Sequence, residues 1–135
     1  MKRKYFILLS ALLLQACATM GGLRNEPLTA GFAQEFEGTF EEVLQATRES
    51  VVSAGLSIEE ANQLTSGTWV IMAKKGTSIF SWGELVRILV EQHQEEAPVV
   101  VRVITKRKGT LNLTAKGDYS DSIFSGIRLA LGGSL

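Results

Sequence analysis

The chain has 135 residues, which is enough for one domain with one hydrophobic core. Its 14 basic and 14 acidic side chains give a formal charge of zero at neutral pH. This balance argues against nucleic acid as a partner, because nucleic-acid binding normally requires a basic face.

The first residues predict a bacterial secretion signal. The positively charged residues Lys2, Arg3 and Lys4 precede an apolar run over residues 5–14, and the small residue Ala16 follows. A charged start, an apolar stretch and a small residue before the cleavage point are the three parts of such a signal.

The only cysteine of the chain stands directly after this pattern. The motif Leu14-Gln15-Ala16-Cys17 resembles the lipobox of bacterial lipoproteins. The resemblance implies that Cys17 carries a diacylglycerol, that residues 1–16 are removed, and that the new N-terminus is acylated, for example with palmitate. Ala18 in place of an aspartate implies, by analogy with enterobacterial lipoproteins, an outer-membrane anchor facing the periplasm.

Two other interpretations of this segment remain. A transmembrane helix needs roughly 20 apolar residues, and the run over 5–14 is about half that long. An ordinary secretory signal could be cut near Ala16 or Ala18, but Cys17 would then be left as a free thiol or would pair with another chain. Lipidation of Cys17 accounts for the cysteine without either consequence.

The chain that would follow the cleavage runs over residues 17–135. It keeps 11 basic and 14 acidic residues, a formal charge of −3, because three of the basic residues lie in the signal. It has no cysteine beyond Cys17. We therefore expect core packing, without disulfides, to hold the fold in an oxidising compartment.

The sequence predicts a lipidated N-terminus and flexible tether over residues 17–27, and a single domain over 28–135. The tether prediction rests on paired glycines, a proline and the lack of periodicity. Within the domain, alternating apolar residues predict a first strand over 28–38. A helix over 40–54 follows, with a capping box from Thr39 to Glu42 and Gly55 at its C-terminal end.

Strands are predicted over 56–64, 69–74, 84–92 and 99–105, the last two forming a hairpin with a loop over 93–98. In this hairpin one face gathers Val86, Ile88, Val90, Val99, Val101 and Val103. Arg87 and Arg102 fall on the opposite face. That second face also carries Leu85, Leu89, Val100 and Ile104. Without a covering helix it would be an exposed apolar patch and a candidate partner surface.

A second, shorter helix is predicted after the capping residues at 118–121, and Gly132-Gly133 end it. The segments around Ile79-Phe80 and over 110–117 have no assignment. The element order predicts an α+β two-layer sandwich, in which an antiparallel sheet of four to five strands carries two helices on one face. This layout resembles the helix-grip domains of BamC, the lipoprotein of the outer-membrane β-barrel assembly machinery. It also resembles small uncharacterised lipoproteins of Gram-negative bacteria.

No group of residues has the pattern of a catalytic or metal site. His93, the sole histidine, lies in a loop near Glu95 and Glu96, and zinc would need more ligands at suitable spacing. The serines lie in no nucleophile-elbow motif. Adjacent carboxylates, as in Glu41-Glu42 and Glu59-Glu60, point apart and indicate capping or strand edges. We expect no catalytic residue, metal or cofactor.

Two basic runs, Lys74-Lys75 and Lys106-Arg107-Lys108, lie at the ends of predicted strands. Lysines there protect strand edges from aggregation, and the alternative is contact with anionic lipid headgroups, lipopolysaccharide or peptidoglycan. Trp69 and Trp82 flank the sheet as core residues or as a surface anchor.

The sequence thus predicts a non-enzymatic, membrane-anchored lipoprotein with a binding or scaffolding role in the cell envelope, and an envelope protein as a possible partner. The alternatives are a small envelope hydrolase and a small-ligand or lipid-binding module. The oligomeric state is not predicted.

Overall fold

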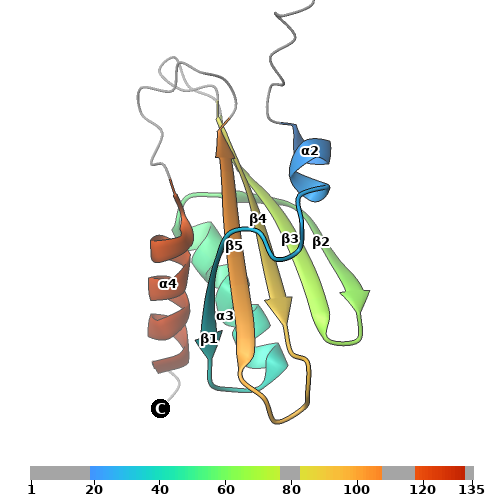
Figure 1. Ribbon diagram of the computed structural model, residues 1–135. Coiled ribbons are helices and arrows are strands. Elements are labelled where there is room, and N and C mark those ends of the chain that lie inside the picture. Colours follow the sequence, from blue (N-terminus) through green and yellow to red (C-terminus); the bar gives the residue numbers. More distant parts are fainter. Residues whose placement is uncertain (1–18, 77–82, 108–117, 133–135) are drawn as a thin grey trace, which may run out of the picture.

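The computed structural model describes residues 19–76, 83–107 and 118–132. Among them a five-stranded antiparallel sheet has the order β1-β5-β4-β3-β2 (Figure 1). Its strands are β1 (Phe32–Phe36), β2 (Ser57–Thr65), β3 (Thr68–Lys75), β4 (Glu84–Glu91) and β5 (Val99–Arg107). The helices are α2 (Met20–Arg24), α3 (Phe40–Ser53) and α4 (Ser120–Gly132). The predicted α+β class is confirmed.

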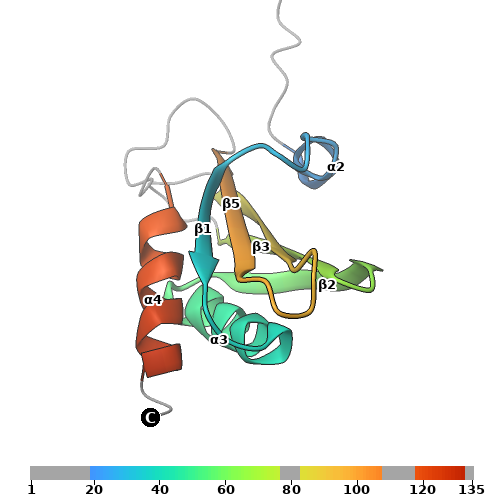
Figure 2. The ribbon, with the colours of Figure 1, turned by 60° about the horizontal axis from the view of Figure 1, so that its bottom comes forward.

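The two longer helices lie on one face of the sheet, as predicted, and the short helix α2 lies on the other (Figure 2). We call these the inner face, under α3 and α4, and the outer face, under α2. The sequence did not predict α2. The sheet is therefore covered on both sides at its centre, and all residues of β4 except the last are buried.

In the β4–β5 hairpin the predicted residues share each face. Ile88 pairs with Val103 and Val90 with Val101, and all four are fully buried in the inner core. β-branched residues suit this position because their stiff side chains fit a pleated, packed surface. Facing them are buried side chains of both helices, among them Val43, Leu44, Val51, Ile123 and Ile127.

The capping box of α3 is present. The Thr39 hydroxyl accepts a hydrogen bond from the Glu42 backbone N–H at 3.3 Å, and the Glu42 carboxylate accepts one from the Thr39 N–H at 2.9 Å. Gly55 follows the helix with φ +81°, a left-handed conformation that glycine adopts without strain. Both features set the direction in which the chain enters and leaves the inner layer.

The start of α4 is set by Asp118, whose carboxylate accepts from the backbone N–H of Ser120 at 2.9 Å and from its hydroxyl at 2.7 Å. The first strand differs from its prediction in extent. The first strand covers only Phe32–Phe36 of the expected 28–38, because residues 28–31 belong to the segment that crosses the outer face. Ile79, Phe80, Trp82 and residues 110–117 lie outside the described residues.

Candidate functional site

The candidate site is the segment that crosses the outer face, residues 19–31, which we call the N-terminal strap. It begins with α2, whose first turn is capped by Thr19: the threonine hydroxyl accepts from the Gly22 N–H at 3.0 Å. Expected as a tether, residues 19–27 are instead packed against the sheet. The tether prediction is wrong for them because Leu23 and Arg87 fix the segment in place.

Leu23 is the apolar anchor of the strap. Its side chain is 1% exposed and lies in a cluster with Val70, Met72, Leu85 and Leu89 of the outer face. The outer face of β4 is thus not an exposed patch. The partner surface considered for Leu89 and Ile104 is covered by the protein's own N-terminal segment.

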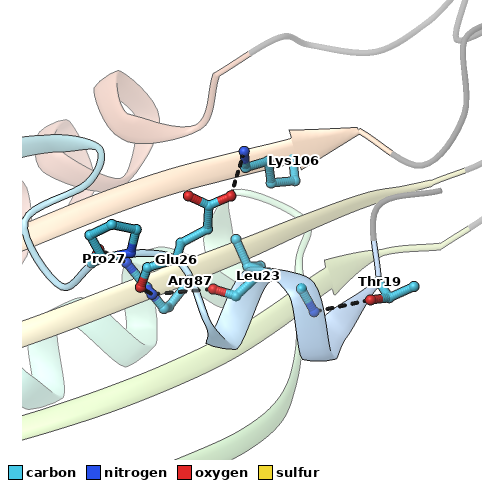
Figure 3. Close-up of polar contacts among 7 residues, drawn as sticks. Thr19, Leu23, Glu26, Pro27, Arg87 and Lys106 are labelled. Carbon is cyan, nitrogen blue, oxygen red and sulfur yellow. Dashed lines mark hydrogen bonds and ion pairs between the residues drawn. The ribbon is translucent and has the colours of Figure 1, made fainter. Parts of the chain in front are cut away.

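Arg87, in the middle of β4, is the polar anchor and is also 1% exposed. Its Nη1 donates to the carbonyls of Leu23 at 3.2 Å and Glu26 at 2.6 Å, and its Nη2 donates to that of Pro27 at 2.7 Å (Figure 3). Burial lowers the pKa of Arg87, while the nearby Glu26 carboxylate acts in the opposite direction. An arginine stays protonated in proteins, so a full positive charge holds the strap.

Exposed contacts surround these two anchors. Arg24 donates to both carboxylate oxygens of Glu60 at 2.7 Å, and Lys106 pairs with Glu26 at 2.8 Å (Figure 3). Each such exposed pair contributes at most about 1 kcal/mol. Their contribution is mainly to fix the position of the strap between β2 and β5.

Arg87 is the residue whose role the sequence analysis missed. The sequence pattern placed it correctly on the outer face. Its burial was not predicted, although the sequence contains a signal for it. An arginine flanked by Leu85 and Leu89 in an apolar strand indicates a covered face, because arginine is rarely buried without partners. What the sequence could not show was that the partners are backbone carbonyls about 60 residues earlier in the chain.

Cys17, the residue with a predicted chemical role, lies outside the described residues. Thr19 follows it by two positions and caps α2, which packs on the sheet through Leu23. None of the helices among the described residues is long and apolar enough to span a bilayer.

The other sequence candidates have individual roles and do not meet in one place. Glu42 caps α3, Glu60 pairs with Arg24, and Glu59 pairs with Lys74 at 3.0 Å. His93 is exposed in the β4–β5 loop. In the three described stretches, no cluster of three or more histidine, cysteine, aspartate or glutamate residues is placed to hold a metal ion.

Trp69 packs against the inner core, and the Arg48 guanidinium lies 5.0 Å from its ring centre. A buried polar pair closes the other end of this core. The Tyr119 hydroxyl donates to the Glu84 carboxylate at 2.7 Å, and both residues are 2% exposed. Burial first, and then the hydrogen bond and charge of Glu84, raise the pKa of Tyr119 far above its ordinary value.

Charge is distributed unevenly along the strands. The end of the domain formed by residues 37–42, 65–68 and 91–97 contains six glutamates and no lysine or arginine. We call it the acidic end. An open groove of about 540 Å³ between α3 and α4 extends from it, and Glu37, Glu41, Glu42 and Glu49 are among its lining residues.

The opposite end carries the two basic runs. Lys74 and Lys75 end β3, while Lys106 and Arg107 end β5. The register brings them together, because Leu85 pairs with both Lys74 and Lys106. We call it the basic end; α2 lies beside it (Figure 1).

Comparisons with protein-family models, with curated proteins and with solved structures found no significant match.

Proposed function

We propose that the protein is an outer-membrane lipoprotein, anchored through the lipid on Cys17, whose α+β domain faces the periplasm. In this proposal the domain acts by binding or scaffolding in the cell envelope and not by catalysis. The observation that carries it is the direct junction between the lipobox and the fold. The strap begins at Thr19 and is fixed by Leu23 and Arg87.

The junction supports the proposal because a lipid on Cys17 would hold the domain directly at the membrane. A lipid on Cys17 inserts acyl chains, and each buried methylene contributes about 0.8 kcal/mol. Only Ala18 then separates this anchor from a folded, sheet-bound segment. The domain would be held at the membrane with almost no slack.

The anchor is tested with Cys17→Ala in the full-length chain. Wild-type protein is expected in the outer-membrane fraction, with a mass that shows signal removal and acylation of Cys17. The variant is expected to keep its signal or to lose its acyl mass. A Cys17→Ala protein that is processed normally and still fractionates with membranes would contradict the anchor.

Sorting is tested at the neighbouring position. Ala18→Asp is expected to move the lipidated protein to the inner membrane, and Ala18→Ser, a matched control, is expected to leave it in the outer membrane. Density-gradient separation of the two membranes gives the answer. Outer-membrane location of both variants would remove the sorting argument.

The binding role is tested by photo-crosslinking in intact cells. A crosslinking residue replaces exposed side chains away from the strap, such as Leu129 on α4, which is 78% exposed, and Ser66 in the β2–β3 turn. A discrete adduct with an envelope protein is expected from at least one exposed surface. A complete scan without any adduct would contradict a scaffolding role.

A further inference from the structure

The N-terminal strap also determines which end of the domain meets the membrane. We propose that the basic end lies on the anionic membrane surface that receives the Cys17 lipid, and that the acidic end is held away from it. This inference rests on the proposed lipid anchor and adds an orientation and a lipid-contacting surface to it.

A very short stretch of chain connects the lipid anchor to α2. Cys17 and Thr19 are two residues apart, and an extended chain spans at most about 3.6 Å per residue. Thr19 therefore stays within about 7 Å of the lipid-bearing residue, which is comparable to the headgroup layer on one side of a bilayer. The start of α2 must lie at the membrane surface.

The helix α2 is fixed on the domain. Leu23 is buried in the outer apolar cluster, and Arg87 binds the carbonyls at the end of the helix and beyond it. The adjacent Glu26 is paired with Lys106, a residue of the basic end. The basic end, which lies next to α2, is therefore also next to the membrane.

The two ends of the domain differ in charge. At the basic end Lys74 and Lys106 are paired with Glu59 and Glu26, and Asp118 and Asp121 lie at the nearby start of α4. Glu84 is buried at this end as well, so the charges of its described residues roughly balance, and Lys75 and Arg107 are exposed. At the acidic end six glutamates have no lysine or arginine among them.

An anionic surface repels this acidic end and attracts exposed basic residues within about a Debye length. The strands of eight or nine residues separate the two ends by roughly 25 Å, at about 3.3 Å per residue. The tether and the charge distribution thus favour the same orientation.

Two positions at opposite ends of β3 provide matched reporters. Gly76 follows the strand at the basic end, and a Cβ there would meet no atom within 4 Å. Ser66 lies in the exposed turn at the acidic end. An azide-bearing residue at either position accepts a fluorescent dye while Cys17 stays available for the lipid.

The experiment uses the full-length chain, purified from bacterial membranes and reconstituted into vesicles that contain phosphatidylglycerol and a headgroup spin-labelled lipid. We expect the dye at 76 to be quenched severalfold more than the dye at 66. Equal quenching at both positions, or stronger quenching at 66, would overturn the proposal.

Three further variants separate the causes. Lys75→Glu with Arg107→Glu is expected to reduce the quenching difference, whereas Arg128→Glu, an exposed arginine on α4, is expected to leave it unchanged. A flexible insertion between Ala18 and Thr19 is expected to reduce it as well. If the quenching difference between 76 and 66 remains in a variant with both the charge reversal and the insertion, neither the exposed charges nor the short connection to the lipid causes the orientation.

Failure of the lipid anchor is distinguishable from failure of the orientation. Mass spectrometry of the purified chain reports whether Cys17 is acylated. A free Cys17 thiol would contradict the proposed function, and the same thiol is then coupled to a maleimide lipid. The quenching comparison of 76 and 66 on those vesicles still decides the orientation.

Discussion

Arg87 is a buried cation whose partners are main-chain carbonyls instead of carboxylates. Hydrogen bonds from a charged donor contribute about 1.5–3 kcal/mol each, more than those between neutral groups. Its acceptors are the carbonyls of Leu23, Glu26 and Pro27, at the end of α2 and in the turn after it. The last carbonyls of a helix have no hydrogen-bond partner within the helix and need one elsewhere. One side chain thus donates through Nη1 and Nη2 to the end of α2 and to the turn after it, while its buried Nε has no hydrogen-bond partner.

Arg87→Met keeps the apolar stem and removes the charge and its hydrogen bonds. We expect the free energy of unfolding to fall by about 2–4 kcal/mol, because the strap carbonyls lose buried donors. Hydrogen exchange should rise over residues 19–31 and remain slow in the β4–β5 hairpin.

The matched control for this change is Arg102→Met. Arg102 also donates to a strap carbonyl, that of Thr29 at 3.2 Å, but it is only partly buried. A smaller loss is expected. Equal losses in the two variants would mean that burial of Arg87 has no special importance.

Because of Tyr119, we expect the free energy of unfolding to depend on pH. Its folded-state pKa is raised by burial and by Glu84, so the fold disfavours the ionised phenol. The contribution of Tyr119 is complete below its unfolded pKa of about 10 and is lost as pH rises above that value. We expect the free energy of urea unfolding to decrease above about pH 10.

The comparison is made with Tyr119→Phe, in which this part of the pH dependence should disappear. Tyr119 is the only tyrosine after residue 5, so tyrosinate absorbance of a chain that lacks the signal reports on this side chain alone. Ionisation with a midpoint near 10 in the folded protein would contradict the buried pair.

At the scale of elements, α3 and α4 pack closely at Gly126. A Cβ at this position would lie 2.7 Å from the Oγ and 2.8 Å from the Cβ of Ser50. The Ser50 hydroxyl itself donates to the Ala46 carbonyl at 2.6 Å, so it cannot turn away without losing that bond. Glycine sets the spacing of the inner helix layer here.

Gly126→Ala is expected to lower the free energy of unfolding by about 1–3 kcal/mol through overpacking, less the roughly 1 kcal/mol that alanine gains in helix propensity. The control is Gly132→Ala, where the new Cβ meets nothing within 4 Å. Adding Ser50→Gly should recover part of the loss. An unchanged free energy of unfolding in Gly126→Ala would show that α3 and α4 can move apart without loss of stability.

The elements of the inner layer could be predicted because their signals are local. The capping box at Thr39, the alternation in β4 and β5 and the apolar stripe of α4 are each visible within a few residues. α2 has no comparable signal. It is five residues long, contains Gly21 and Gly22, and such a short helix is not stable by itself. It forms because tertiary packing on Leu85 and Leu89 holds it.

At the scale of the whole molecule, the folded domain includes residues 19–27, which the sequence placed in a tether before a boundary at Leu28. A chain that starts at Phe32 would expose the outer faces of β3 and β4, with Leu85, Leu89 and Arg87. We expect it to be less stable than a chain starting at Thr19 by at least about 3 kcal/mol, because burial of Leu23 and the Arg87 bonds are lost.

Urea unfolding of the two soluble chains, with light scattering for association, makes this comparison. The shorter chain is expected to aggregate through its uncovered outer face. Equal stability and solubility of the two chains would mean that the strap is not part of the folded domain.

The uneven distribution of charge between the two ends of the domain could not be predicted from the sequence, because strand register decides which glutamates lie at the same end.

The strap has a mechanical consequence. Any tension between the N-terminal side of the chain and the domain reaches α2 first and Arg87 next, before it reaches β1. We expect the strap to peel away while the sheet stays intact, and its 13 residues to lengthen the connection to about 45 Å. A pulling experiment on a chain held at residue 19 should show this short extension as the first event. A first rupture that unravels the sheet would rule it out.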